Sequence, residues 1–186
     1  MTKILFFDTE TTGKANFNAP PDAEYQPRIV QLGALLCDEK ECEIASINLI
    51  IRPVFEIPVE ASNVHGITTE FAKSCGVPVF YALQLFWALV RQADLLVAHN
   101  IAFDSFIIKG ESLRFVTDTL EKPEVCTMKA MTPRCKIPGR YEDYKWPKLS
   151  EAYRHAFGKD LDGAHDAMSD IRATKDVYFW ITKQSS

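Results

Sequence analysis

The chain has 186 residues, of which 47% are hydrophobic and 25% are charged, and its formal net charge is −4. This length and apolar content predict a single folded domain spanning residues 1–186, with a core of its own. No apolar run approaches the roughly 20 residues of a membrane-spanning helix, and the N-terminus leads straight into strand-like sequence rather than a signal peptide. We therefore expect a soluble, cytoplasmic protein without membrane association. The five cysteines show no Cys-x-x-Cys spacing, which favours reduced thiols over a zinc site or a disulfide framework.

Three strands are expected in the first third of the chain. Residues 3–8, 29–36 and 44–51 are rich in Ile, Leu and Val and are separated by turn-forming or charged segments. We expect these strands to pair antiparallel. Lys14 to Pro27 holds several Asn and Pro residues but few core-forming ones, so it is predicted to be a long loop. The sequence leaves open whether this loop guides a ligand or is mobile.

Helices dominate the rest of the chain, with short strands between them. Phe80 to Val90 is apolar nearly all round and predicts a buried helix, and Leu95 to Ala98 predicts a strand. The next apolar residues keep helical spacing and predict a long helix with one solvated face; they are Phe103, Phe106, Ile107, Leu113 and Leu120. Gly110 weakens this prediction slightly. The last predicted elements are an extended piece near Val125, a helix from Pro147 to Phe157 with Pro147 in its first turn, and a helix through Val177 and Ile181. The fold class is α/β, a mixed sheet flanked by helices.

Acidic residues stand where the first predicted strand ends. Asp8 and Glu10 are two positions apart, so in extended backbone their side chains share a face. Like charges this close favour a cation between them, which predicts a metal site. Asp104 lies in the first turn of the helix that follows the predicted strand Leu95 to Ala98, and Asp170 comes near the C-terminus, five residues after His165.

The segments around these acids resemble motifs of a known family. They are Phe7-Asp8-Thr9-Glu10-Thr11-Thr12-Gly13, His99-Asn100-Ile101-Ala102-Phe103-Asp104, and the run from His165 to Asp170. Together they resemble the DEDDh, or DnaQ-like, 3′-to-5′ exonucleases, the family of the proofreading epsilon subunit of bacterial replicative polymerase and of RNase T. The resemblance implies an RNase H-like sheet, in which three antiparallel strands are followed by parallel strands. It also implies hydrolysis of terminal phosphodiester bonds, with release of nucleoside 5′-monophosphates.

Phosphodiester hydrolysis requires a nucleophilic water, neutralisation of the phosphoryl charge and stabilisation of the leaving oxygen, all of which two divalent ions can supply. The resemblance makes Asp8, Glu10, Asp104 and Asp170 the ligands of two Mg²⁺ or Mn²⁺ ions, which prefer oxygen donors. We expect Asp8 to bridge both ions. Glu10 and Asp170 are expected to hold the ion that carries the attacking water, and Asp104 to act on the second ion, which stabilises the leaving 3′ oxygen.

His165 stands at the position of the family's histidine and is expected to be the general base, since imidazole accepts a proton near neutral pH. Asp166 is expected to be a bystander or a helix cap. The resemblance further predicts that the terminal nucleotide is contacted by Thr9, Glu60, His65 and Phe103. Each has a plainer alternative: Thr9 as strand-end sequence, Glu60 as a solvated charge, His65 as a turn residue and Phe103 as a core residue. His99 is expected to be structural.

The expected partner is a nucleic acid with a free 3′ end, and we favour single-stranded DNA. Trimming of RNA 3′ ends remains an alternative because the motifs do not separate the two polymers. A non-catalytic domain that binds nucleic acid or a polymerase is a second alternative, disfavoured because the four acids and His165 are all present. A polymerase or a second copy of the chain is left open as a partner. Because the sequence stops at Ser186, soon after the last predicted helix, we expect a stand-alone enzyme.

One stretch of the chain is basic, although the net charge of the whole chain is negative. Residues 129–148 hold six Lys and Arg residues and only two acids, Glu142 and Asp143. This stretch is either a solvated loop or a rail for the phosphates of the substrate.

Overall fold

The computed structural model describes residues 1–115, 121–140, 143–161 and 166–184. Five strands form one sheet: β1 (Lys3–Thr11), β2 (Ile29–Asp38), β3 (Glu43–Ile50), β4 (Leu95–Ala98) and β5 (Glu124–Cys126). The helices of the described residues are α1 (Val59–His65), α2 (Thr69–Cys75), α3 (Val79–Gln92), α4 (Ile101–Phe115), α5 (Thr127–Cys135), α6 (Leu149–Phe157) and α7 (Ala167–Gln184). No described helix is both long enough and apolar enough to cross a membrane.

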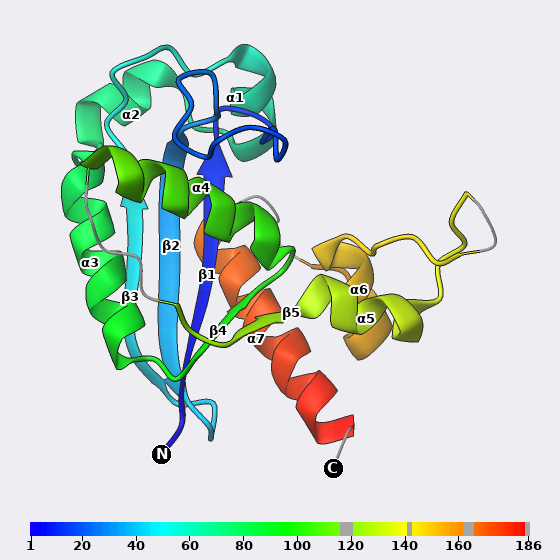
Figure 1. Ribbon diagram of the computed structural model, residues 1–186. Helices are drawn as coiled ribbons and strands as arrows, with labels where there is room; N and C mark the ends of the chain where they lie inside the picture. The colour runs from blue at the N-terminus through cyan, green and yellow to red at the C-terminus, as the bar shows by residue number, and fades with distance from the viewer. Residues whose placement is uncertain (116–120, 141–142, 162–165, 185–186) are drawn as a thin grey trace.

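The sheet has the strand order β3-β2-β1-β4-β5, with β1 at its centre (Figure 1). β1 pairs antiparallel with β2, and β2 pairs antiparallel with β3. β1 also pairs parallel with β4, and β4 pairs parallel with β5. The predicted mixed sheet, with three antiparallel strands followed by parallel ones, is therefore confirmed.

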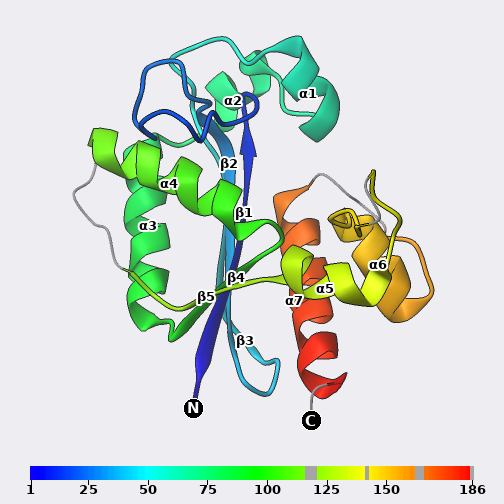
Figure 2. The same ribbon diagram turned by 45° about the vertical axis from the view of Figure 1, so that its right-hand side comes forward.

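Both faces of β1 are covered, which explains the continuous apolar run from Ile4 to Phe7. Leu5 and Phe7 belong to the cluster that includes the buried side of α3 and part of α4. Ile4 and Phe6 belong to the cluster on the opposite face, with Ile171 and Phe179 of α7 among its members. Figure 2 shows α3 and α4 on one side of the sheet and α7 on the other. The side chains of β1 therefore alternate between α3 and α4 on one face and α7 on the other.

Two smaller clusters attach the remaining helices. Met131 of α5, Ala152 of α6 and Val177 of α7 form one of them, so α5 and α6 are packed onto α7 rather than onto the sheet. The other cluster, with Ile57, Ile67 and Ala72 among its members, holds α1 and α2 near the end of the sheet where β1 stops (Figure 1).

Several predicted boundaries were wrong. β1 continues through Thr11, three residues beyond the predicted end, so Asp8 and Glu10 lie within the strand. Pro147 precedes α6 instead of standing in its first turn, because the Lys148 amide is capped by the Glu151 carboxylate at 2.8 Å and the helix begins at Leu149. The short helices α1, α2 and α5 were not predicted; α1 buries none of its residues, so it has no apolar periodicity.

The predicted faces of two helices also need correction. Leu113 of α4 is 50% exposed, although its spacing placed it in the core. The buried side of α4 instead includes Gly110, which lies against Pro21, Glu111, which binds Arg28, and Ser112, which accepts a hydrogen bond from Trp87 of α3. Phe80 to Val90, apolar nearly all round, was predicted to form a buried helix, yet Tyr81 and Leu85 of α3 are exposed because only one side of the helix meets the sheet. Leu120 lies outside the described residues.

Candidate active site

Asp8 and Glu10 project from the α7 face of β1, because alternation places them on the same side as Ile4 and Phe6. Asp8 is paired with Gly33 of β2. A Cβ atom at Gly33 would lie 2.5 Å from Cδ1 of Ile171 and 3.2 Å from Cβ of Ala167. The missing side chain therefore allows the first turns of α7 to lie close against the sheet, beside the two acids.

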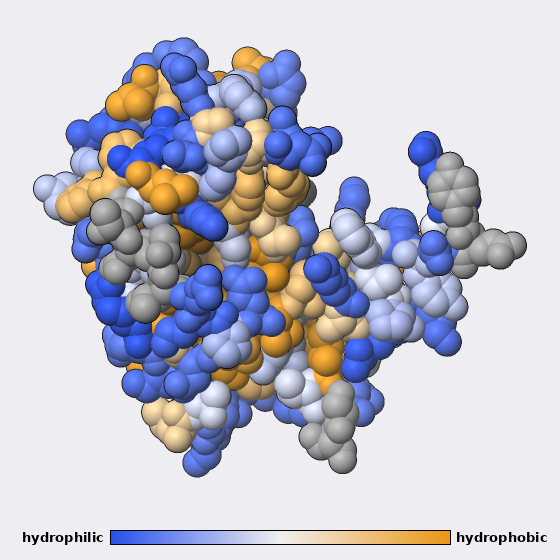
Figure 3. Space-filling model, in the orientation of Figure 1, coloured by the Kyte–Doolittle hydropathy of each residue, from blue (hydrophilic) through white to orange (hydrophobic). Residues whose placement is uncertain are grey.

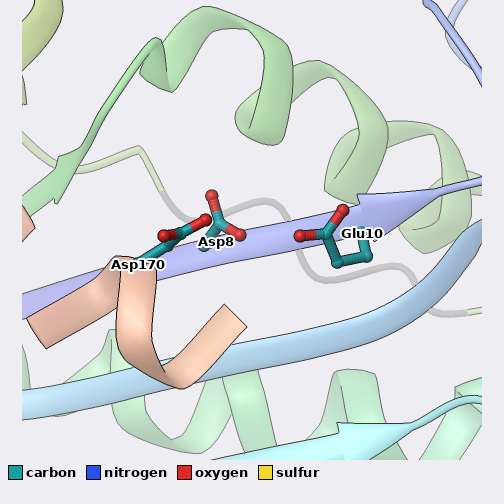
Figure 4. Close-up of side chains that lie close together, drawn as sticks. All are labelled: Asp8, Glu10 and Asp170. Carbon is teal, nitrogen blue, oxygen red and sulfur yellow. The ribbon is translucent and has the colours of Figure 1, made fainter. Parts of the chain in front are cut away.

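Asp170 reaches the same place from the first turn of α7. This turn is capped by Asp166, whose Oδ2 accepts hydrogen bonds from the Ser169 amide at 3.0 Å and from the Ser169 hydroxyl at 3.1 Å. Carboxylate oxygens of Asp8, Glu10 and Asp170 all lie within 4.8 Å of one another. Figure 4 shows the three carboxylates gathered between β1 and the start of α7.

Asp104 approaches from α4 and is held by Thr9. Its Oδ1 accepts hydrogen bonds from the Thr9 amide at 3.0 Å and from the Thr9 hydroxyl at 2.7 Å. Only 3% of Asp104 and 6% of Thr9 is exposed. Thr9 points to the opposite face of β1 from its neighbours Asp8 and Glu10. The strand therefore carries two acids on one face and, on the other, the threonine that binds the carboxylate of Asp104.

Burial and mutual repulsion raise the pKa values of these acids. Burial raises the pKa of Asp8 well above its usual value, and the charges of Asp104, Glu10 and Asp170 raise it further. The pKa of Glu10 is raised to about 8, by burial first and then by the charge of Asp170. Burial also raises the pKa of Asp104 to about 7, although the hydrogen bonds from Thr9 act in the opposite direction.

The donor set fits hard divalent cations. Carboxylates that are clustered, half-buried and mutually repulsive are stabilised when a cation lies between them, and Mg²⁺ and Mn²⁺ prefer oxygen ligands. Asp8, Glu10 and Asp170 are the described residues that meet the geometric requirement for a shared ion. Asp104 is not one of these three, but its negative charge raises the pKa of Asp8, so the two carboxylates interact.

The other predicted site residues are more dispersed. Glu60 is exposed in the first turn of α1, and His65 ends the same helix, near the end of the sheet where β1 stops (Figure 1). His65 Nδ1 accepts a hydrogen bond from the Ile67 amide at 3.1 Å. Phe103, in the first turn of α4, packs partly against the main core. His165 lies outside the described residues. Contact of Thr9, Glu60, His65 and Phe103 with a nucleotide stays a prediction.

His99 is structural, as predicted from its position at the end of β4. Its Nδ1 pairs with the Thr127 hydroxyl oxygen and its Nε2 with the Pro147 carbonyl oxygen, both at 3.0 Å. Burial lowers the pKa of His99, so the ring is neutral and can satisfy one donor and one acceptor contact. The next residue, Asn100, has φ of 74°, a left-handed conformation that turns the chain from β4 into α4.

Two features of the site were not found from the sequence. Gly33 permits the close approach of α7, and an isolated glycine inside an apolar strand was the available signal. Thr9 anchors Asp104 across 95 positions of sequence, a contact that nothing in the local pattern indicates. Asp166 had been expected to be a bystander or a cap, and its contacts with Ser169 identify it as a cap.

Carboxylates clustered on a mixed sheet of this topology define a class, that of metal-dependent nucleases. The family model described as Exonuclease matches residues 5–178, and the chain belongs to this family. The resemblance recognised from the motifs is therefore confirmed, as is the prediction that the chain is a nuclease.

Named relatives agree with this assignment. An exonuclease of Escherichia phage 186 is 29% identical over 184 residues, covering 91% of this chain and 83% of the phage protein. The DNA polymerase III subunit epsilon of Rickettsia conorii is 31% identical over 178 residues, covering 94% of this chain and 71% of the subunit. A PolC-type DNA polymerase III of Clostridium perfringens is 30% identical, and the match covers 94% of this chain but 11% of the polymerase.

Solved structures share the fold. Escherichia coli Exonuclease I in complex with a dA16 oligonucleotide superposes with a TM-score of 0.77 at 19% identity, over 98% of this chain. The complex with a dT13 oligonucleotide gives a TM-score of 0.78 at 18% identity. This chain spans 41% of the first of these proteins and 42% of the second. At this identity the likeness establishes the fold alone.

Proposed function

We propose that this chain is a 3′-to-5′ exonuclease that uses two divalent ions to remove nucleoside 5′-monophosphates from single-stranded DNA. The observation that carries the proposal is the convergence of Asp8, Glu10 and Asp170 within 4.8 Å, beside Asp104, in a member of the exonuclease family. The strands and helices that carry these residues are held by independent contacts, namely Gly33 beneath α7 and Thr9 beside α4.

The proposed roles combine the family resemblance with the positions of the acids. Asp8, Glu10 and Asp170 would hold one ion, and Asp8 together with Asp104 would hold the other. Bound divalent ions would activate a water and neutralise charge on the phosphate and the leaving oxygen. His165 is proposed as the general base, supported by its match to the family's histidine and by its place just before α7.

DNA is favoured over RNA on the names of the relatives. The epsilon subunits and the PolC-type enzyme are named as parts of DNA polymerases, and the Exonuclease I structures contain deoxyribonucleotide strands. These are properties of those proteins, and they support the DNA proposal here by analogy. RNA trimming is the competing outcome in the experiment below. A non-catalytic role is disfavoured because all four acids are retained and three of them meet.

The test is a cleavage time course on DNA and RNA oligonucleotides labelled at either the 5′ or the 3′ end, with Mg²⁺, with Mn²⁺ and with chelator. A 3′-to-5′ exonuclease yields a ladder from the 5′-labelled strand and labelled mononucleotide at once from the 3′-labelled strand. The proposal fails if cleavage is internal, starts at the 5′ end or persists in chelator. Faster turnover of RNA would replace the DNA proposal with RNA trimming.

Variants sharpen this experiment. Asp170→Asn should lower the rate by a factor of about 10³ or more, because a neutral amide is a poor ligand for Mg²⁺. Asp166→Asn is the matched control, since it removes an equal charge four residues away and its amide oxygen can still cap α7. It should stay within about threefold of the parent chain. His165→Ala should lower the rate by about 10²-fold or more, and a rate close to that of the parent chain would remove His165 from the mechanism.

A further inference from the structure

A basic and aromatic hairpin connects α5 to α6, the two helices that pack on α7. We call it the basic hairpin and define it as the exposed residues Lys136, Arg140, Tyr144, Lys145, Trp146 and Lys148. Figures 1 and 2 show this segment extending outward from α5 and α6, and Figure 3 shows it as a mainly hydrophilic arm that projects from the body. Residues 141 and 142, at its tip, lie outside the described residues.

The hairpin has a defined backbone. Pro138 and Tyr144 form an antiparallel bridge. The Gly139 amide donates to the Asp143 carbonyl at 2.7 Å, and the Lys145 amide donates to the Ile137 carbonyl at 3.0 Å. A Cβ atom at Gly139 would lie 2.5 Å from the Asp143 carbonyl oxygen, so glycine is needed for the two arms to approach. The backbones of the two arms are therefore held at fixed positions relative to one another.

The base of the hairpin is tied to the strand that leads into the active site. Pro147 follows the hairpin's Trp146, and its carbonyl oxygen is bonded by His99 Nε2 at 3.0 Å. His99 directly follows β4 and lies five residues before Asp104, the acid that α4 contributes to the cluster. This contact fixes the point where the hairpin leaves the body relative to the carboxylates.

The exposed groups of the hairpin are of the types that bind single-stranded nucleic acid in other proteins. Trp146 is 64% exposed and Tyr144 is 47% exposed, so neither ring is used in the core. Aromatic rings of this kind stack on bases, and Lys and Arg nearby neutralise backbone phosphates. Lys145 is engaged by Glu151 at 2.6 Å, so Lys136 and Arg140 are the cations assigned to phosphate.

We propose that the basic hairpin is a second binding site for the substrate strand, contacting nucleotides upstream of the 3′ end that is cleaved. Trp146 and Tyr144 stack on bases, while Lys136 and Arg140 bind phosphates. This inference rests on the proposed function, because it assigns the substrate strand of that activity to the hairpin. It has a direct consequence: a strand too short to extend from the carboxylates to the hairpin gains nothing from it.

The test measures binding of fluorescent single-stranded DNA, about 4 or about 20 nucleotides long, in chelator so that nothing is cleaved. Trp146→Ala and the double variant Lys136→Ala/Arg140→Ala should each weaken binding of the long strand by about fivefold or more, while binding of the short strand stays within about twofold. Trp146→Phe should retain most of the affinity because it keeps a ring. The double variant should also reduce the slope of log affinity against log salt by about 1.4, since each phosphate contact contributes about 0.7.

The control is Lys3→Ala/Lys40→Ala, which removes two charges from the start of β1 and the β2–β3 turn, at the opposite end of β1 from Thr11. The inference is overturned if the hairpin variants bind the long strand as tightly as the control variant does. It is also overturned if a hairpin variant with unchanged thermal unfolding binds both strand lengths equally more weakly. The proposed function is decided separately, by turnover of the parent chain with Mg²⁺. Absent turnover with a length-dependent loss of binding would reject the activity and retain the hairpin site.

Discussion

Thr9 shows how one side chain can set the chemistry of another. Its amide and hydroxyl both donate to Asp104 Oδ1, and these hydrogen bonds lower the pKa of Asp104 against the larger effect of burial. The carboxylate is thereby favoured over the protonated acid, which cannot bind a metal well. Thr9 is therefore a positioning residue for Asp104, in addition to any contact with the terminal nucleotide.

We expect Thr9→Val to raise the Mg²⁺ concentration needed for half-maximal rate by about tenfold, because a charge-assisted hydrogen bond of roughly 1.5–3 kcal/mol is lost. The rate at saturating Mg²⁺ should change little, and Thr9→Ser should restore the parent behaviour. Titrations of Mg²⁺ and of DNA distinguish the two roles of Thr9. A change confined to the KM for DNA would indicate a nucleotide contact and would contradict positioning through Asp104.

At the scale of whole elements, the segment Lys14 to Pro27 and the residue that follows it, Arg28, are attached to α4. The Arg28 guanidinium makes two hydrogen bonds to the buried Glu111 carboxylate, at 2.6 and 2.9 Å. Arg114 donates to the Ala23 carbonyl at 2.8 Å, and the buried Gln26 side chain donates to the Asn16 carbonyl at 2.7 Å. These contacts identify the loop as a packed element beside the end of β1, rather than a freely moving segment.

Gly110 is the point where the loop and α4 come closest. A Cβ atom there would lie 2.2 Å from the Pro21 carbonyl oxygen, a backbone atom. We expect Gly110→Ala to lower Tm by several degrees and to expose residues 14–27 to limited proteolysis. The free energy lost through this clash should exceed the roughly 1 kcal/mol by which alanine stabilises a helix relative to glycine. Lys109→Ala, at an exposed neighbouring position, is the control; a rise in Tm for Gly110→Ala would show that the loop yields easily.

The same elements explain what the sequence could and could not predict. β1, β2 and β4 were recognisable because continuous apolar runs mark strands buried on both faces, and the spacing of Asp8 and Glu10 required a shared face. α1 was missed because it buries no residue, and Leu113 was misplaced because its helix packs against a loop with a glycine and an ion pair. Such long-range packing has no local periodicity. The acids of α4 and α7 were linked to β1 by family resemblance rather than by pattern.

At the scale of the whole molecule, the carboxylate cluster opposes folding when it is charged and empty of cations. The pKa of Glu10 is about 8 in the folded chain, against an ordinary value of 4.5, and the pKa of Asp8 is also raised. Between about pH 4.5 and pH 8 the folded state therefore binds more protons than the unfolded state. The free energy of unfolding must fall as the pH rises through this window. A divalent ion that binds only the folded state reverses the effect.

We therefore expect the Tm measured in chelator to fall by about 5 °C or more between pH 5 and pH 8, the scale of change that roughly 2 kcal/mol produces in a domain of this size. Saturating Mg²⁺ should recover most of this loss at pH 8 and little at pH 5, where protonated carboxyls compete with the metal. The double variant Asp8→Asn/Glu10→Gln should flatten the pH dependence and abolish the response to Mg²⁺. A parent chain whose Tm is insensitive to both pH and Mg²⁺ would contradict the premise that the buried acids repel one another, because ionisation of the cluster would then cost the fold nothing.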